Sequence, residues 1–412
     1  MKINADRLWN THKILASFTE PERPYTRRSF TPLYKEARAW LEKAFKEIGL
    51  VVKYDAAGNL TGLYEGETNQ IVAVGSHTDT VPAGGRFDGV SGVLSFLEVA
   101  RCMRENNYVP KKSILGIDFL AEEPSEFGLS CIGSRLATGN FNDDMLSLRH
   151  HKTNQSLLDV VDEFGGNTAA LKQGKSTFDV EKMDAYFELH IEQGPILEKK
   201  ELDVGLVTCI CSVTRYDFTI FGRADHAGNT PMDMRADAVV SAAKMIDMIS
   251  KIAHESLDSG IFFTATVGNM SVYPNASNVI AKRVNFTLDI RSEDNNLVAK
   301  NLAKIFDGVS EIEQETNTKI EYKKISQDEP ALSDEKLLSI LENNAKKLDL
   351  KYTRLLSGAG HDAAYMCTKM PMAMIFIPCK GGRSHLPEES TTKTQLENGA
   401  NLLLESLITC TS

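Results

Sequence analysis

Long apolar segments are missing from this sequence. No window reaches the roughly 18 uninterrupted apolar residues that a transmembrane helix needs, and residues 1–7 contain no apolar core of a signal peptide. Cysteine is scarce as well: the 412 residues include seven, none with the spacing of a zinc site. Because an odd number of scattered cysteines is typical of reduced thiols, we expect a cytoplasmic protein.

Positive charge is also in short supply. The chain has 46 Lys and Arg against 56 Asp and Glu, which gives a net charge of −10 at pH 7. No basic stripe stands out, so nucleic acid and anionic membranes are not expected partners. The hydrophobic content of 42% and the charged content of 25% describe an ordinary globular protein. A small molecule is therefore the expected ligand.

The length and the order of apolar segments predict two domains of the α/β class. A chain of 412 residues is too long for one simple core. Strand-like runs alternate with helical patterns, as in a sheet with helices on both faces. The strand-like runs are residues 71–74, 114–120, 185–189 and 374–377, and helical patterns cover 33–48 and 92–103.

A different order of elements occupies the middle of the chain. Between residues 213 and 324 the pattern is β-α-β-β-α-β, which is typical of a ferredoxin-like unit that can close as its own domain. We therefore predict a mixed-sheet domain made of residues 1–210 and 329–412. A ferredoxin-like α+β domain of residues 211–328 is inserted into it.

Each strand-like run of the larger domain leads into imidazole or carboxylate side chains. The first run ends in Gly75–Pro82, which contains His77 and Asp79, and Asp88 follows on a glycine-flanked turn. The other three runs lead to Glu122-Glu123, to His190 and to His385. Ligands of open α/β sheets gather beyond the carboxyl ends of the strands, so these side chains are expected at one edge.

This set of side chains is suited to a pair of divalent metal ions. Such a pair needs a carboxylate that bridges both ions, further imidazole or carboxylate ligands on each side, and an open position for water. We predict Asp88 as the bridge, with His77 and His190 on one ion and Glu123 and His385 on the other. Zinc fits this mixed set of nitrogen and oxygen ligands, and so do manganese, cobalt and nickel.

Two further acidic residues have predicted supporting roles. A metal ion lowers the pKa of a water bound to it towards about 7, so that a nearby carboxylate can take its proton. Glu122, adjacent to the predicted ligand Glu123, is placed for that role. Asp79, two residues after His77, is placed to orient the imidazole.

Five segments of the chain form a recognisable set of motifs: Gly75–Thr80, Glu122-Glu123, Glu188–Pro195, Asp225–Met232 and Ser357–Ala363. Together they resemble one known family, the amidase, hydantoinase and carbamoylase branch of the M20 metallopeptidases. Its members include N-carbamoyl-L-amino-acid hydrolases, β-ureidopropionases and allantoate amidohydrolases. The resemblance extends in order from about Tyr25 to the last predicted helix.

The resemblance implies roles for individual residues. The metal ligands would be the five residues selected above, with Glu122 as the general base and His226 as a second catalytic residue. The inserted domain would act as a lid and form a homodimer, and its histidine would reach the partner's active site. Substrate would be held by Gln193, His226, Asn278, Arg291 and Gly360.

The implied activity is hydrolysis of the C–N bond of an N-carbamoyl-L-amino acid or a related ureido acid, by a binuclear metal-dependent enzyme acting on linear amides. Allantoate amidohydrolase, N-acyl-L-amino-acid amidase or dipeptidase, and a non-catalytic binding protein remain alternatives. Two departures from the family pattern leave the substrate open. Pro124-Ser125-Glu126 replaces Gly-Ser-Arg, and Ser212-Val213-Thr214 replaces Gly-Gln-Arg, with Arg215 as a possible substitute for the missing cation.

Overall fold

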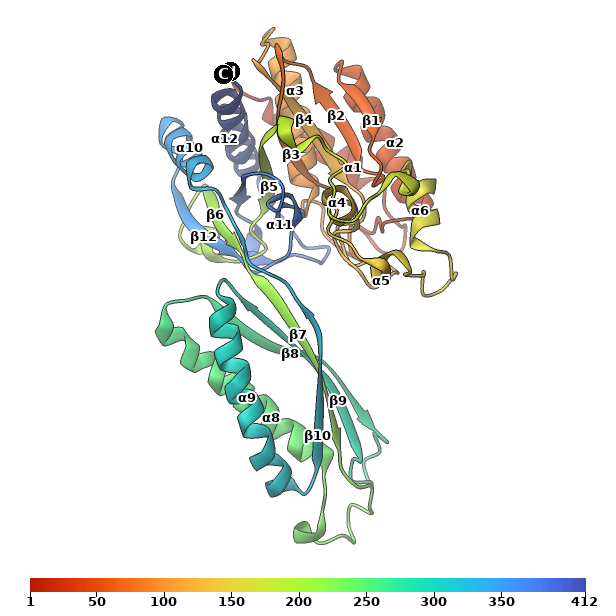
Figure 1. Ribbon diagram of the computed structural model, residues 1–412. Helices are drawn as coiled ribbons and strands as arrows, with labels where there is room; N and C mark the ends of the chain where they lie inside the picture. The colour runs from red at the N-terminus through yellow and green to blue at the C-terminus, as the bar shows by residue number, and fades with distance from the viewer. The chain divides into compact units, whose positions relative to one another are not determined.

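The computed structural model describes all 412 residues, which form two compact units (Figure 1). Unit 1 contains Met1–Thr208 and Leu332–Ser412, and unit 2 contains Cys209–Ala331. All seven cysteines are free thiols. None of the helices combines the length and the apolar character needed to cross a membrane.

Unit 1 is built on a nine-stranded mixed sheet, as the sequence predicts. The strand order is β1-β2-β4-β3-β5-β13-β6-β11, and β12 pairs with β6. The neighbours β4, β3, β5 and β13 are parallel, whereas β1–β2, β2–β4 and β13–β6 are antiparallel. The strands are β1 (Val51–Tyr54), β2 (Leu60–Tyr64), β3 (Thr68–His77), β4 (Lys112–Phe119), β5 (Met183–Ile191), β6 (Val204–Ile210), β11 (Ala331–Leu332), β12 (Tyr352–Ser357) and β13 (Met372–Ile377).

Helices cover both faces of this sheet. On one face, a core of buried apolar residues joins the sheet to α1, α2, α3, α10 and α12. On the other face, α4 packs against β4, and α11 packs against β5 and β13. The helices of unit 1 are α1 (Ala5–Ala16), α2 (Pro32–Glu47), α3 (Val90–Glu105), α4 (Ile132–Thr138), α5 (Asp143–Leu146), α6 (Leu157–Glu163), α7 (Ile196–Lys199), α10 (Glu335–Lys347), α11 (Ala363–Met366) and α12 (Lys393–Thr411), with short 3₁₀ helices at Thr168–Ala170, Val180–Lys182 and Lys380–Gly382.

The central strands are apolar along most of their length because helices shield them from water on both sides. Val72, Ala73 and Val74 of β3 are fully buried, and every residue of β13 is buried. The strands run further than the apolar runs predict. His77 and His190 lie inside β3 and β5, since the backbone pairing continues as far as His77 opposite Phe119 and Phe376 opposite His190. A polar side chain does not end a strand whose backbone groups remain paired.

Unit 2 has the element order β7-α8-β8-β9-α9-β10. Its four strands are antiparallel in the order β10-β7-β9-β8, and α8 and α9 close an apolar core against the sheet. Arg291 lies within β9, because the pairing of β9 with β7 continues to Ser292. The bounds are β7 (Ser212–Phe221), α8 (Ala238–Glu255), β8 (Phe263–Tyr273), β9 (Arg283–Ser292), α9 (Asn295–Thr316) and β10 (Lys319–Gln327), with 3₁₀ helices at Met232–Met234 and Ser256–Ser259.

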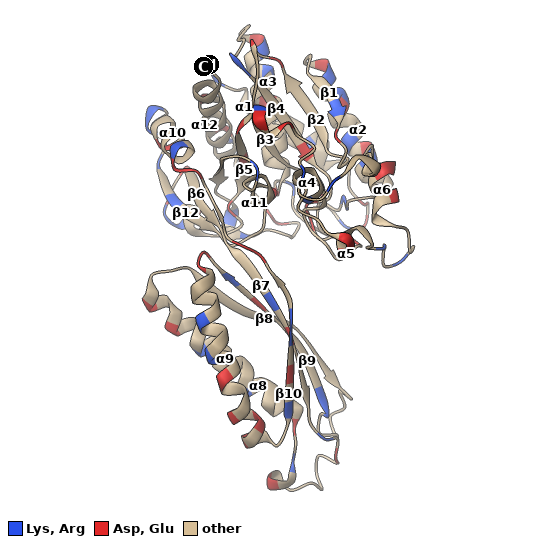
Figure 2. Ribbon diagram, in the orientation of Figure 1, with Lys and Arg blue, Asp and Glu red and all other residues tan.

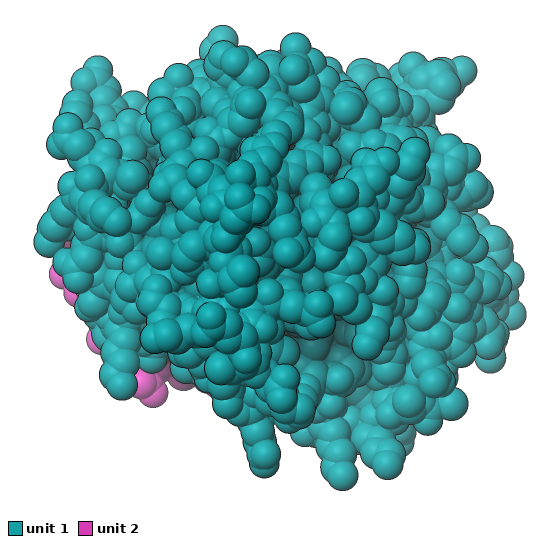
Figure 3. Space-filling model, turned by 90° about the horizontal axis from the view of Figure 1, so that it is seen from above, with its two compact units in different colours: residues 1–208, 332–412 teal, residues 209–331 magenta.

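Charged residues of both signs occur in both units. Figure 2 shows Lys and Arg together with Asp and Glu along the helices and strands of each unit. The two units are coloured separately in the space-filling view of Figure 3. The excess of acidic residues is therefore spread along the chain and is not confined to one element.

Gly116 of β4 tests the packing between the sheet and α3. A Cβ atom at this position would lie 1.8 Å from Cε1 of Phe96, so that ring would have to move. We expect Gly116→Ala to destabilise the protein by about 1–3 kcal/mol, the usual cost of overpacking a core. Urea denaturation measures the change. Gly268→Ala is the control, because a Cβ there meets no atom within 4 Å. Equal stability of the two variants would contradict the described packing.

Candidate metal centre

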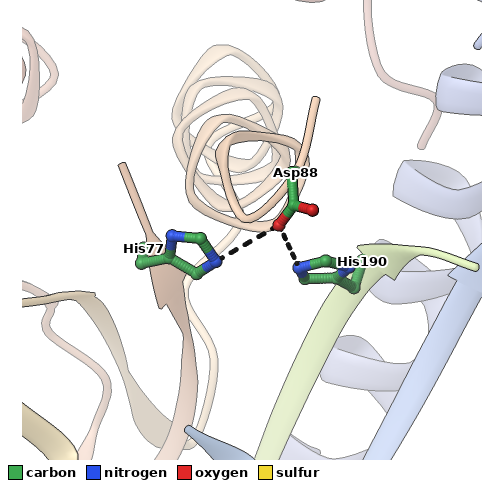
Figure 4. Close-up of side chains that lie close together, drawn as sticks. All are labelled: His77, Asp88 and His190. Carbon is green, nitrogen blue, oxygen red and sulfur yellow. Dashed lines mark ion pairs between the residues drawn. The ribbon is translucent and has the colours of Figure 1, made fainter. Parts of the chain in front are cut away.

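The five predicted metal ligands lie together at the carboxyl ends of the central strands. His77 ends β3, His190 is near the end of β5, Glu123 follows β4, and His385 follows β13. Asp88 lies on the turn that leads into α3. Figure 4 shows the rings of His77 and His190 facing the Asp88 carboxylate from two sides.

The two oxygens of Asp88 face different imidazoles. Oδ1 lies 3.5 Å from Nε2 of His77 and 3.1 Å from Nε2 of His190, whereas Oδ2 lies 3.3 Å from Nε2 of His385. Oε1 of Glu123 lies 3.6 Å from the same His385 nitrogen. Candidate ligand atoms lie within 4.8 Å of one another in two groups, His77 with Asp88 and His190, and Asp88 with Glu123 and His385. One carboxylate is thus shared by two ligand groups.

The charges of this cluster fit bound cations. Asp88, Glu122 and Glu123 are buried, and none of them forms an ion pair with Lys or Arg. Burial raises the pKa of the Glu123 carboxyl well above its ordinary value, and the charges of Asp88 and Glu122 raise it further. Burial also disfavours the Asp88 carboxylate, but the surrounding imidazoles hold its pKa well below the usual range. A buried carboxylate cluster of this kind coordinates metal ions or takes up protons.

Backbone contacts fix which imidazole nitrogens face the centre. Nδ1 of His77 lies 3.1 Å from the carbonyl oxygen of Asp79, and Nδ1 of His190 lies 2.8 Å from that of Ile191. A carbonyl oxygen only accepts hydrogen bonds, so both Nδ1 atoms carry the proton. The Nε2 lone pair of His190 also accepts from the backbone N–H of Gly89 at 3.0 Å. Both Nε2 atoms therefore face the centre without a proton, which is the tautomer that a metal ligand requires.

Asp79 ties β3 to the loop after β4. Its two carboxylate oxygens accept hydrogen bonds from the backbone N–H groups of Glu122 and Glu123, each at 3.2 Å. Its Oδ1 also lies 3.5 Å from Nδ1 of His77. Asp79 thus contacts the imidazole that it is predicted to orient, and it also holds the backbone of both glutamates.

Glu122 lies beside this cluster with its carboxylate facing two groups. Oε2 is 3.5 Å from Nε2 of His77, and Oε1 accepts a hydrogen bond from the Cys131 thiol at 3.2 Å. Burial raises the pKa of that thiol well above its ordinary value, so it keeps its proton and remains a donor. Burial raises the pKa of the Glu122 carboxyl as well, and the His77 charge opposes that shift.

Glu389 and Ser384 support the centre and are not evident from the sequence. Oε1 of Glu389 accepts from the backbone N–H groups of Phe87 and Asp88, at 2.8 and 3.0 Å. The Ser384 hydroxyl lies 2.6 Å from Oδ2 of Asp88 and 2.8 Å from Oε2 of Glu389. Glu389 belongs to the acidic pair Glu388-Glu389 on a loop, so only its burial distinguishes it from a solvated glutamate.

His361 and Asp362 are also buried next to the centre, although neither is assigned a role from the sequence. The His361 ring packs against the His190 ring with centroids 4.6 Å apart, and its Nε2 lies 2.8 Å from the Ser357 hydroxyl. Oδ1 of Asp362 accepts from the Ser134 hydroxyl, while Oδ2 has no hydrogen-bond partner. Both residues belong to Ser357–Ala363, one of the five segments that resemble the family. That resemblance is the feature of the sequence that could have pointed to them.

Of the predicted substrate residues in unit 1, Gln193 contacts the candidate metal ligands directly. Its Nε2 lies 2.6 Å from Oδ2 of Asp88 and 3.4 Å from Nε2 of His385. Its Oε1 is buried without a hydrogen-bond partner and its φ is 55°, a strained conformation of the kind found at functional sites. Gly360, in contrast, has open space where a Cβ would be.

The predicted substrate residues in unit 2 lie on a loop and on β9. Nδ1 of His226 accepts hydrogen bonds from the backbone N–H groups of Gly228 and Asn229, both at 3.1 Å, so its Nε2 carries the proton in the neutral ring. The carbonyl oxygen of Asn278 accepts from the N–H of Ala227 at 3.0 Å, which places Asn278 beside the His226 loop. The imidazole is therefore held as a hydrogen-bond donor.

Arg291 shares a carboxylate with Arg215. Nε of Arg291 donates to Oδ1 of Asp289 and Nε of Arg215 donates to Oδ2, both at 2.9 Å. Arg215 is the residue that the sequence suggests as a substitute for the missing family arginine. The Asp289 carboxylate holds both guanidinium groups on the same face of the sheet, because Arg215 and Asp289 are cross-strand partners.

Glu126, which stands where the family pattern has an arginine, is engaged in ion pairs. It pairs with Arg28 and, at 3.1 Å, with Lys152. Nη2 of Arg28 also donates to the carbonyl oxygen of Pro124 at 3.3 Å. The negative charge introduced at position 126 is thus offset by two cations.

Comparison with known proteins decides the family. The model of peptidase family M20/M25/M40 matches residues 73–409. The chain belongs to this family. Members are metal-dependent hydrolases, in agreement with the ligand geometry described above.

Similar proteins place this M20 member in the hydantoinase and carbamoylase branch. A rice "Ureidoglycolate hydrolase" is 36% identical over 407 residues, which are 97% of this chain and 84% of the relative. An "N-carbamoyl-L-amino-acid amidohydrolase" from Paenarthrobacter aurescens is 34% identical over 98% of this chain and 97% of the relative. The crystal structure of an amidase of the hydantoinase/carbamoylase family from Burkholderia multivorans has a TM-score of 0.91 and 33% identity, and the match covers 100% of this chain and 98% of that one.

Glu389 offers a test of how the centre is held together. Glu389→Gln replaces the carboxylate by a neutral amide, which should weaken the hydrogen bonds from the backbone N–H groups of Phe87 and Asp88. We expect metal affinity to fall about 10- to 100-fold, as is typical when a group that orients a ligand is changed. Metal retained after dialysis, measured by mass spectrometry, reports the loss. Glu388→Gln is the matched control, because Glu388 is exposed and should retain metal like the wild type. Equal retention by both variants would rule out the role assigned to Glu389.

Proposed function

We propose that this protein hydrolyses the C–N bond of an N-carbamoyl-L-amino acid or a related ureido acid. The observation that carries the proposal is the Asp88 carboxylate, whose two oxygens face separate imidazole groups beside the buried Glu122. The similarity to N-carbamoyl-L-amino-acid and ureidoglycolate hydrolases supports the substrate class.

The ligand sets proposed for two divalent ions are His77, Asp88 and His190 for one, and Asp88, Glu123 and His385 for the other. Zinc, manganese, cobalt and nickel all suit these donors. When bound, the ions activate water and polarise the scissile carbonyl. Asp88 would be the ligand common to both sets, because its Oδ1 faces His190 and its Oδ2 faces His385.

Glu122 is the proposed proton carrier. Its Oε2 faces the cluster, where it can take a proton from the attacking water and pass it to the leaving nitrogen. Burial raises the pKa of this carboxyl, which makes it a stronger base than an exposed glutamate. The Cys131 thiol, which donates to Oε1, keeps the carboxylate oriented with Oε2 towards the cluster.

The substrate's own charges are proposed to be held by residues of unit 2. Arg291, with the Asn278 amide, is suited to bind the carboxylate of the amino-acid part, and Asp289 fixes the guanidinium for this contact. The proton on Nε2 of His226 can be donated to the oxygen that gains negative charge during hydrolysis. Gln193, with an unpaired Oε1 in unit 1, can accept a hydrogen bond from a substrate N–H.

Unit 2 is proposed to be a ferredoxin-like lid and dimerisation domain. Its β-α-β-β-α-β order and its β10-β7-β9-β8 sheet support the ferredoxin-like assignment. The strand β8 lies at the edge of that sheet, and such edges can pair with a second chain. The free cysteines support the proposed cytoplasmic location.

A panel of substrates distinguishes the proposed activity from that of an N-acyl-amino-acid amidase and from a binding protein. We expect the purified enzyme, supplied with each divalent metal in turn, to release ammonia from N-carbamoyl-L-amino acids or from the ureido acids allantoate and ureidoglycolate. No acetate should be released from N-acetyl-L-amino acids. Acetate release without ammonia release would assign the protein to the N-acyl-amino-acid amidases, and a complete lack of turnover would favour the binding protein.

Replacing Glu122 by Gln tests its role as the base. The substitution removes the proton acceptor while it preserves the size of the side chain, so we expect turnover to fall to the background rate and the metal content to remain unchanged. Glu126→Gln, on the same loop, is the control and should retain activity, because Glu126 is engaged by Arg28 and Lys152. Undiminished turnover of Glu122→Gln would exclude Glu122 as the base.

A further inference from the structure

One face of the sheet in unit 2 points away from α8 and α9. The buried apolar side chains of β7 and β9 pack against these two helices, which lie on the same side of the strands (Figure 1). Successive side chains of a strand point to opposite faces, so every second residue of β7 and β9 lies on the other face. The polar residues of that face are Arg215, Asp217 and Thr219 in β7, and Arg283, Asn285, Thr287, Asp289 and Arg291 in β9.

Arg215 carries donor groups on this face that the chain does not use. Its Nε donates to Oδ2 of Asp289 at 2.9 Å, whereas Nη1 and Nη2 form no hydrogen bond or ion pair within the chain. Neither of these two nitrogens is buried, and the side chain is 43% exposed. The next residue of β7 on the same face, Asp217, accepts a hydrogen bond from the Thr287 hydroxyl at 2.8 Å. A ligand can therefore reach two charged N–H₂ groups of Arg215.

Asp289 separates this guanidinium from that of Arg291. Arg291 donates to Oδ1 and Arg215 donates to Oδ2, so the carboxylate lies between the two cations. Burial disfavours the charged form of Asp289, but the hydrogen bonds and charges of the two arginines hold its pKa below the ordinary value. Asp289 is therefore negative at neutral pH, and it repels a further carboxylate from the position between the arginines. Each guanidinium is suited to a carboxylate of its own.

We propose that Arg215 selects ureido substrates that carry a second carboxylate, on the side chain of the amino-acid part. The inference rests on the proposed hydrolysis, in which Arg291 binds the α-carboxylate. The N-carbamoyl derivative of an acidic amino acid offers its second carboxylate to Nη1 and Nη2 of Arg215, and a guanidinium binds both oxygens of such a group. The derivative of the corresponding amide has nearly the same size but no charge, so it gains less from this contact.

Steady-state kinetics with two substrates of equal size tests the role of Arg215. The full-length enzyme, supplied with the divalent metal that gives the highest activity, is assayed with N-carbamoyl-L-glutamate and N-carbamoyl-L-glutamine. The measured product is the free amino acid, because ammonia could also come from the side-chain amide. We expect kcat/KM to be about tenfold higher for the glutamate derivative, as is typical of a hydrogen bond between charged groups at a partly exposed site. The difference should lie in KM.

Two substitutions of Arg215 and one control assign this preference. Arg215→Gln should bring the ratio of the two kcat/KM values close to one, because it raises KM for the glutamate derivative. Arg215→Lys keeps the positive charge and should retain part of the preference. Arg283→Gln is the matched control, because Arg283 lies on the same face at the opposite end of β9 and loses the same charge. It should keep the wild-type ratio.

Several results would overturn the assignment. Equal kcat/KM of the wild type for both substrates would overturn this inference and leave the proposed hydrolysis intact. Turnover of neither substrate, nor of any other N-carbamoyl or ureido acid, would overturn both. A wild-type ratio in Arg215→Gln, whatever its overall activity, would show that Arg215 only positions Asp289 and Arg291. Loss of the preference in Arg283→Gln would attribute it to the total charge of the sheet face.

Discussion

The structure of unit 1 depends on burying several carboxylates at one edge of a sheet. Asp88, Glu122 and Glu123 are removed from water without an ion pair to Lys or Arg, so positive charge has to come from imidazoles, protons or metal ions. Sharing Asp88 between two groups of ligand atoms lets one side chain serve both. The same burial that makes these carboxylates costly to accommodate raises the pKa of Glu122 and thereby makes it a stronger base.

A second layer of hydrogen bonds holds this arrangement in place. The Asp79 carboxylate accepts hydrogen bonds from the backbone N–H groups of Glu122 and Glu123. The Glu389 carboxylate accepts them from the backbone N–H groups of Phe87 and Asp88. These contacts join segments that are distant in the sequence, because Glu389 follows β13 and Phe87 precedes α3. Because these hydrogen bonds come from backbone N–H groups, they fix the conformation of the turns. The side chains on the turns are therefore oriented before any ligand binds.

The convergence of the five candidate ligands could be predicted from the sequence, because each follows or ends an apolar strand and parallel strands place their carboxyl ends at one edge. The mixed sheet and helix α3 could be predicted for similar reasons of periodicity. Other features could not. The sequence does not show that His77 and His190 belong to β3 and β5, because backbone pairing does not depend on the polarity of the side chain. Glu389 resembles any loop glutamate until its burial is known, and the contact between Gln193 and Asp88 depends on a left-handed backbone that a glutamine seldom adopts.

The strand order of unit 1 has a consequence for biosynthesis. β13 lies between β5 and β6 in the middle of the sheet, yet its residues follow all of unit 2 in the chain. When the ribosome has made everything up to residue 371, β5 and β6 still lack the neighbour that joins them, and His385 is not yet present. Unit 2 is complete by then and can fold first, whereas the sheet and its metal centre can close only near the end of translation. The nascent chain therefore passes through a stage in which β5 and β6 each have an open edge, and such edges can pair with other chains until β13 is made.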